Sequence, residues 1–307
     1  MYKSYLKNES DSQFHAISEP IVDSWIHCEG ATLQDLKEIS KIIRVDPEDL
    51  KDSLDMLEIA RIERIENNAV VIYTRYPYMQ EVGLYTTPLT IILAKESIVT
   101  ICPISSTLMQ RILNEPSKLA TKMRSKFLIH ILIRIIQEYN KVVKRVRAEV
   151  INQEKDISQV SDAEITELTK KEENLNQCLN SLLPLKKVIE EMLTGRFTIL
   201  NEEDQESLED LLHTTAQAED LCRLSLRIIT SLRNSVQIVI TNQFNQTIRL
   251  LTALTIILNL PTTISSIYGM NISLPFSHSP YAFLFIIGFI VIMLIGAFFF
   301  FQRRRWL

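Results

Sequence analysis

The stretch from Asn245 to Asn271 reads NQTIRLLTALTIILNLPTTISSIYGMN, and the rest of the chain is best interpreted outward from it. It is long enough to cross a bilayer, which takes about 20 helical residues. It is not uniformly apolar, because polar residues recur every seventh position and therefore share one side of a helix. We call this set the polar stripe; it comprises Asn245, Thr252, Thr255, Asn259, Thr262 and Ser266.

The polar stripe has two interpretations. Polar side chains are tolerated at membrane depth where they face protein or water instead of lipid. Ser, Thr and Asn could therefore hydrogen-bond between packed helices, or they could line a water-filled path. The opposite face, with Leu250, Leu254, Ile257 and Ile264, suits lipid or a neighbouring helix. One helix and a single partner cannot enclose a path, so the second interpretation requires a cyclic homo-oligomer.

Charge distribution predicts the membrane topology. No Asp, Glu, Lys or Arg occurs between Leu250 and Gln302, a window that holds two spans, at about Thr247–Tyr268 and Tyr281–Phe301. The connecting loop has no basic residue, whereas Arg303, Arg304 and Arg305 follow the second span. The positive-inside rule then places both termini in the cytoplasm. We expect a multi-pass protein of the cell (inner or plasma) membrane, with the lipid bilayer as its surroundings.

Composition argues against several function classes. The 307-residue chain carries a net charge of −4, which disfavours a nucleic-acid partner. Its four cysteines include no CxxC pair, and no GxxxxGK[ST] loop is present. Its five histidines are scattered, and no nucleophile and base can be paired. The sequence therefore predicts neither an enzyme nor an organic cofactor.

The N-terminal part of the sequence predicts an α/β domain over residues 1–105. Thr32 and Asp35 form a capping-box-like start for a helix to about Arg44, and Asp46-Pro47 opens another. The predicted strands are Pro20–His27, Ile59–Ile65, Ala69–Tyr76 and Leu89–Cys102, the last folded by a turn at Lys95-Glu96-Ser97.

The remaining sequence predicts helices. Residues 106–202 form a helical hairpin region, which turns near Asp156 to Asp162. Residues 203–271 form one stalk helix that continues into the first span and is roughly 100 Å long. A short external loop, 272–280, leads to the second span and basic tail, 281–307. The predicted architecture is an α/β cytoplasmic domain, a long helical stalk and two C-terminal transmembrane helices.

The order of these segments resembles the CorA family of magnesium and cobalt transporters. Tyr268-Gly269-Met270-Asn271 closes the penultimate span, and a tail ending Trp306-Leu307 follows the last one. A bare GMN tripeptide is a weak signal, but GMN in this position is a strong one. Trp25-Ile26, Asp46-Pro47 to Leu54-Asp55, Leu182 to Leu185 and Glu203 to Asp220 extend the resemblance over nearly the whole chain.

The resemblance implies a funnel-shaped cyclic homo-oligomer, a pentamer, that conducts divalent cations. Gly269, Met270 and Asn271 match the family's selectivity motif, and Asn245 matches a pore-lining asparagine near the inner end. Asp52 and Asp210 match aspartates that face each other across protomers and bind regulatory Mg²⁺, whose loss opens the pore. Mg²⁺ is thus expected both as transported ion and as regulator.

The expected mechanism is passive. Moving a divalent cation through 100 mV releases about 4.6 kcal/mol. A ring of neutral Asn271 oxygens suits an ion that keeps its waters, as Mg²⁺ does. Chiefly Mg²⁺ is expected, with Co²⁺ and Ni²⁺ as further ions; the alternatives are a zinc transporter of the same superfamily and a membrane-tethered scaffold. The loop after Asn271 lacks Asp and Glu, so electrostatic capture of ions there is expected to be weak.

Overall fold

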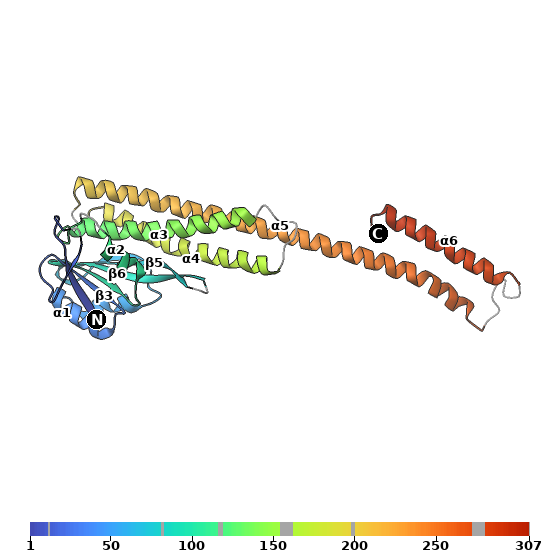
Figure 1. Cartoon of the computed structure of the whole chain (residues 1–307), viewed down its shortest axis with the longest axis horizontal. Helices are drawn as coiled ribbons and strands as arrows, with labels where there is room; N and C mark the ends of the chain where they lie inside the picture. The colour runs from blue at the N-terminus through green and yellow to red at the C-terminus, as the bar shows by residue number, and fades with distance from the viewer. Residues whose placement is uncertain are drawn as a thin grey trace. The chain divides into compact units, whose positions relative to one another are not determined.

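The computed structural model describes residues 1–11, 13–80, 83–115, 119–153, 162–197, 200–271 and 280–306 (Figure 1). The chain divides into two compact units, an N-terminal unit over Met1–Leu232 and a C-terminal unit over Arg233–Leu307. The N-terminal unit contains a sheet with helices on both faces. The C-terminal unit contains the end of one long helix and one further helix. The predicted combination of an α/β domain, a long helix and two candidate membrane helices is confirmed.

A seven-stranded sheet organises the N-terminal unit, in the order β2-β1-β3-β7-β6-β5-β4. The pairing is antiparallel except between β3 and β7, where Trp25 lies opposite Ile98. The strands are β1 (Tyr2–Leu6), β2 (His15–Ile17), β3 (Ser24–Glu29), β4 (Arg61–Arg64), β5 (Val70–Gln80), β6 (Gly83–Leu93) and β7 (Ser97–Cys102). All six residues of β7 are buried, as expected of a strand that is covered on both faces.

Each face of the sheet packs into a separate core, because successive strand residues point to opposite sides. Trp25, Ile72 and Ile98 belong to the core shared with the long helices, whereas their neighbours Ile26 and Val99 belong to the core under the first helix. Trp25 is fully buried, and its indole N–H donates to the Thr100 hydroxyl at 2.8 Å.

Local sequence signals explain the first two helical segments. α1 (Leu33–Ile43) begins at the predicted capping box: the Thr32 hydroxyl accepts from the Asp35 amide, and the Asp35 carboxylate accepts from the Thr32 amide. η1 (Pro47–Leu54) begins at Asp46, whose carboxylate accepts from the Glu48 amide, and it is a 3₁₀ helix. The two predicted helix starts are therefore confirmed.

All four of the predicted strands shift at their ends, and β4 is shorter than the predicted Ile59–Ile65. β3 begins only at Ser24, because Asp23 has a φ of +64° and the Ser24 amide bonds back to Ile21. β5 and β6 each extend further than predicted, since they pair along their whole length as a hairpin. The predicted turn at Lys95 does separate β6 from β7. β1 and β2 were not predicted.

The second face of the sheet is covered by helices, which Figure 1 shows running side by side. These are α2 (Thr107–Asn114), α3 (Arg124–Gln153), α4 (Asp162–Leu193) and α5 (Glu202–Tyr268). Buried residues of α3, α4 and α5, such as Tyr139, Leu182 and Cys222, share one core with the sheet. Most of the predicted break between α3 and α4, near Asp156 to Asp162, lies outside the described residues.

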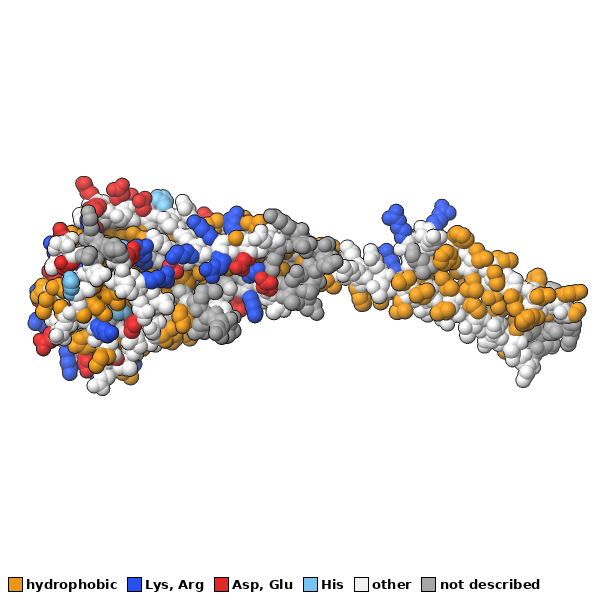
Figure 2. Space-filling view, viewed as in Figure 1, with side chains coloured by type: hydrophobic (Ala, Val, Ile, Leu, Met, Phe, Trp, Pro, Cys, Tyr) orange, Lys and Arg blue, Asp and Glu red, His pale blue; other side chains and the backbone are white. Residues whose placement is uncertain are grey.

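The C-terminal unit holds the end of α5, a helix of 67 residues, and α6 (Ala282–Arg303). By length and composition, both helices could cross a membrane, and their apolar windows are almost entirely exposed. These two apolar windows are thus unlike the core helices of a soluble domain, which are mostly buried. Figure 2 shows hydrophobic side chains covering this unit and charged ones over the N-terminal unit.

The capping box gives a first testable expectation. Thr32→Ala removes the hydroxyl that caps α1 and should lower the free energy of unfolding of the N-terminal unit by about 1 kcal/mol. In a unit of this size that corresponds to a melting temperature roughly 2–4 °C lower, measurable by circular dichroism on the full chain. Thr32→Ser keeps the hydroxyl and serves as the control. Equal melting temperatures for both variants would contradict the assignment.

Candidate functional site

The six residues of the polar stripe all lie on α5 within the C-terminal unit. Thr252 is half-buried, and the other five side chains are exposed in the single chain. Successive members seven residues apart drift by only about 20° around the helix. The stripe is therefore one continuous polar surface along this part of α5, which also carries Thr247, Arg249, Thr263 and Ser265.

The threonine hydroxyls of the stripe donate to their own helix. Thr252 Oγ1 donates to the Ile248 carbonyl at 2.7 Å, and Thr255 Oγ1 donates to the Leu251 carbonyl at 2.8 Å. Thr262 Oγ1 donates to the Leu258 carbonyl at 3.2 Å. Each hydroxyl has one proton and two lone pairs. Because the proton is already used, the hydroxyl oxygens can act outward only as acceptors.

The asparagines of the stripe differ from the threonines. In the described part of the chain, the side-chain amides of Asn245 and Asn259 make no hydrogen bond, although each offers two donors and an acceptor oxygen. An amide transferred to hydrocarbon without a partner costs about 4–8 kcal/mol. In a membrane, the Asn259 amide, which lies inside the predicted span, therefore needs a partner from outside the single chain, either water or another copy.

The GMN motif follows directly after α5. The Gly269 amide donates to the Ser265 carbonyl at 2.9 Å, and the Met270 amide donates to the Ile267 carbonyl at 3.2 Å. A Cβ atom at Gly269 would approach the Ser265 carbonyl oxygen to 3.3 Å, so a larger residue would crowd this turn. Asn271 is exposed beyond the helix end. Residues 272–279 of the predicted external loop lie outside the described residues.

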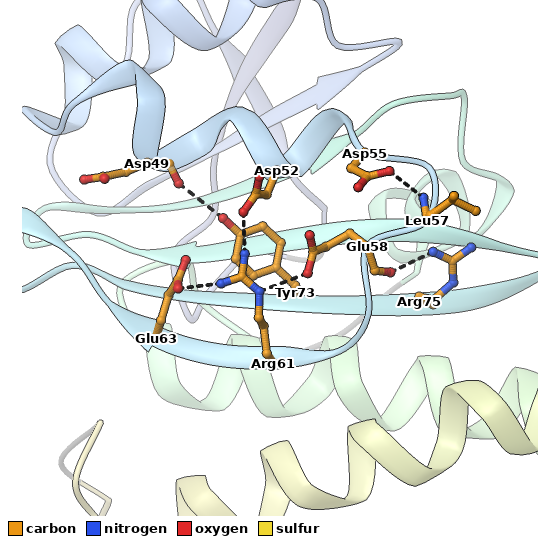
Figure 3. Close-up of polar contacts among 9 residues, drawn as sticks. All are labelled: Asp49, Asp52, Asp55, Leu57, Glu58, Arg61, Glu63, Tyr73 and Arg75. Atoms are coloured by element: carbon orange, nitrogen blue, oxygen red, sulfur yellow. Dashed lines mark hydrogen bonds and ion pairs between the residues drawn. The ribbon is translucent and has the colours of Figure 1, made fainter.

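Asp52, the first predicted regulatory residue, lies on η1 and is held by an arginine (Figure 3). Arg61 on β4 contacts three carboxylates with its three nitrogens: Asp52 at 2.6 Å, Glu58 at 2.9 Å and Glu63 at 2.5 Å. Asp52 is 57% exposed, whereas Glu58 is only 14% exposed. The single positive charge of the guanidinium is thus shared among three carboxylates, which leaves the cluster with a net negative charge.

The surroundings of Arg61 keep it charged. Burial opposes the charged form, but the hydrogen bond to Glu58 and the negative charges of Glu63 and Glu58 outweigh burial and raise the pKa of Arg61. Its guanidinium carbon also lies 4.2 Å from the centre of the Tyr73 ring. Tyr73 in turn donates from its hydroxyl to the Asp49 carbonyl at 3.2 Å, which links η1 to the sheet.

A second arginine fixes the segment between η1 and β4. Arg75 Nη1 donates to the Met56 and Glu58 carbonyls at 3.0 and 2.7 Å, and its other nitrogens bond to Thr86 on β6. Burial lowers the pKa of Arg75. The two arginines together position Glu58 beside Arg61. Sequence reasoning missed both, because their partners lie on several segments, η1, the connection to β4, β4 itself and β6, which only the fold brings together.

Asp210, the second predicted regulatory residue, is exposed on α5. It has no hydrogen bond or ion pair within the described ranges. Among those same residues, no group of three or more His, Cys, Asp or Glu side chains is arranged to hold a metal ion.

Comparison with known proteins identifies related sequences. The family model for CorA-like Mg²⁺ transporter proteins matches residues 23–304. The cobalt/magnesium transport protein CorA of Methanocaldococcus jannaschii is 27% identical over 182 residues, which cover 59% of this chain and 57% of that protein. The matched region thus spans little more than half the length of this curated relative.

Solved structures share the fold. The complete CorA magnesium transporter from Methanocaldococcus jannaschii superposes with a TM-score of 0.86 at 22% identity, covering 100% of this chain and 99% of that one. The full-length CmaX protein superposes with a TM-score of 0.77 at 12% identity, and the match covers 98% of this chain and 97% of that one. The cytoplasmic domain of ZntB from Vibrio parahaemolyticus superposes with a TM-score of 0.62 at 10% identity, and the match covers 76% of this chain and 96% of that one.

The arginine-centred cluster generates a second prediction. Arg61→Gln leaves Asp52, Glu58 and Glu63 without their counter-ion and should destabilise the N-terminal unit by about 1–3 kcal/mol in EDTA. Added Mg²⁺ should restore part of that loss by screening the three carboxylates. Melting of the full chain with and without Mg²⁺ measures both effects.

Lys51→Gln is the matched control, because it removes one positive charge from the same segment but breaks only an exposed pair with Glu48. That pair should contribute less than about 1 kcal/mol. If Arg61→Gln melted like Lys51→Gln in EDTA, Arg61 would not be the counter-ion of the cluster.

Proposed function

Because the chain belongs to the family of CorA-like Mg²⁺ transporter proteins, we propose that it conducts hydrated divalent cations, chiefly Mg²⁺, passively across a membrane. The observation that carries the proposal is the polar stripe, whose asparagine amides have no partner in the described chain. A water-filled path supplies those partners. The membrane potential supplies the driving force, about 4.6 kcal/mol per divalent ion and 100 mV.

The path requires several copies of the chain. In a cyclic homo-oligomer, the same stripe of every subunit faces one axis, and α6, which is apolar along its length, faces lipid. We propose a pentamer with a funnel-shaped cytoplasmic part and with both termini in the cytoplasm. The single-chain exposure of the stripe agrees with this arrangement, because side chains that face the axis gain their partners only on assembly.

Asn271 and its neighbours Gly269 and Met270 are proposed to select the ion. A ring of Asn271 side chains offers neutral oxygens, which can accept hydrogen bonds from the waters of a hydrated cation. Carboxylates would bind the metal directly and slow its release. Gly269 suits the turn before this ring, because its missing Cβ avoids the Ser265 carbonyl.

Asp52 and Asp210 are proposed to bind regulatory Mg²⁺ between protomers. Two carboxylates brought together repel each other unless a cation lies between them, so bound metal favours the closed assembly. Arg61 contacts Asp52 through Oδ2 only. Asp52 Oδ1 has no partner among the described residues and is available to a metal-bound water.

A zinc-conducting pathway is the second candidate, and the likeness to the ZntB cytoplasmic domain favours it. The polar stripe contains neither Cys nor His, the softer ligands that favour zinc. This composition favours Mg²⁺, with Co²⁺ and Ni²⁺ as further ions. Competition between zinc and magnesium fluxes in the same vesicles separates the two candidates.

The transport proposal is tested by the flux of Mg²⁺ into proteoliposomes under an inward potential. Asn271→Ala removes the proposed amide ring and should lower the flux about ten-fold, which corresponds to about 1.4 kcal/mol of lost ion stabilisation. Asn180→Ala, an exposed amide on α4, is the control and should retain wild-type flux. Absence of flux in the wild-type chain, with a known channel active in parallel, would refute conduction. Equal flux for Asn271→Ala and Asn180→Ala would refute the selectivity role.

The regulatory proposal is tested by limited proteolysis of the N-terminal unit in the full-length assembly. Asp52→Ala and Asp210→Ala should each require about ten-fold more Mg²⁺ for half-maximal protection, equivalent to about 1.4 kcal/mol of binding free energy. Asp220→Ala changes an exposed acid on another face of α5 and should behave as wild type. Unchanged protection midpoints in both test variants would remove these residues from the site.

A further inference from the structure

The two units of the chain have opposite charge. The C-terminal unit, from Arg233 onward, contains five arginines and not one Asp, Glu or Lys. The N-terminal unit contains the other 28 Lys and Arg and all 37 Asp and Glu. Three of the five arginines, Arg303, Arg304 and Arg305, are consecutive at the end of α6. Such asymmetry between parts of one chain indicates interaction with a charged surface.

The three arginines are held by a defined helix end. The Trp306 amide donates to the Phe301 carbonyl at 3.0 Å, and the Arg305 amide donates to the Gln302 carbonyl at 3.0 Å. Arg305 has a φ of +56°. These two hydrogen bonds and the left-handed residue form a Schellman motif. Glycine is the low-cost residue at such a position, but this chain places a third arginine there.

The motif also carries the apolar contact that usually accompanies it. The Trp306 ring stacks on the Phe301 ring, with centroids 5.6 Å apart and planes 26° from parallel. Phe301 is consequently buried, whereas Trp306 is half-buried. Trp at the end of a membrane helix prefers the interface, where its ring meets apolar chains and its N–H meets water. The stacked pair therefore fixes the depth of the arginines.

The arginine side chains remain available. All three are exposed, and none has an ion pair with a carboxylate in the described part of the chain. Arg304 lies beside an apolar ring, with its guanidinium carbon 5.9 Å from the centre of Phe300. Figure 2 shows blue side chains gathered near the C-terminal end of α6, with no red ones over this unit in that view.

We propose that this arginine cap, Arg303 to Trp306, is a binding site for the phosphate headgroups of anionic phospholipids. Guanidinium groups match phosphate oxygens in geometry and charge, and the stacked Trp306 places them at headgroup depth. The site requires only that α6 crosses a bilayer, and it does not depend on ion conduction. Loss of magnesium flux and loss of lipid binding are therefore separate results.

The test uses Trp306 as the reporter, because the other tryptophan, Trp25, is fully buried in the sheet core. The full-length protein is reconstituted with brominated phosphatidylglycerol or brominated phosphatidylcholine at equal mole fraction, and quenching of tryptophan fluorescence is compared. Trp306→Phe supplies the baseline that is subtracted. The quenching ratio is the Trp306 quenching by brominated phosphatidylglycerol divided by that by brominated phosphatidylcholine. At low salt it should be about five, the preference expected for one arginine in contact with an anionic headgroup.

The triple variant R303Q/R304Q/R305Q should bring the ratio close to one, whereas R303K/R304K/R305K should retain a preference. The matched control K144Q/R145Q/R147Q removes the same charge from α3 and should keep the wild-type ratio. High salt should weaken the wild-type preference, which tests the proposal even where a variant inserts poorly. A wild-type ratio near one at low salt, or an unchanged ratio in the triple glutamine variant, would overturn it.

Discussion

Polar groups that cannot be satisfied inside one chain are the constraint on which this structure depends. The amides of Asn245 and Asn259 lie on α5, and hydrocarbon offers no hydrogen bond to Asn259, which lies within the predicted span. The threonines between them avoid this cost by donating to their own backbone. The two asparagines and Ser266 are therefore the members of the stripe without a side-chain hydrogen bond in the described chain, and the proposed ring of identical helices around water would provide their partners.

The helix that carries the polar stripe, α5, also belongs to the N-terminal unit. α5 contributes Leu208, Ala218 and Ile229 to the core beneath the sheet, and further along it carries the polar stripe. α5 is thus one continuous helix whose first part packs in the core of the N-terminal unit and whose later part carries the polar stripe.

The sequence predicted the parts of the fold that local signals determine. The capping box at Thr32, the Asp46-Pro47 start and the long helix with its polar stripe depend on residues within one or two turns of each other. β1 was missed because Tyr2–Leu6 is only five residues long and its strand conformation depends on pairing with β2 and β3, which lie further along the chain. Arg61 was missed for a similar reason: its role depends on Asp52, which chain folding alone brings to its side.

In the proposed path, the direction of the threonine hydrogen bonds would favour cations although no carboxylate lines the stripe. A hydrated cation turns the oxygens of its waters inward, so its outer surface consists of O–H donors; a hydrated anion presents the reverse. Thr252, Thr255 and Thr262 have already given their protons to backbone carbonyls and can only accept. Their oxygens therefore match the surface of a hydrated cation and not that of a hydrated anion. Selection by sign of charge then requires no charged group at membrane depth, where such a group would be costly.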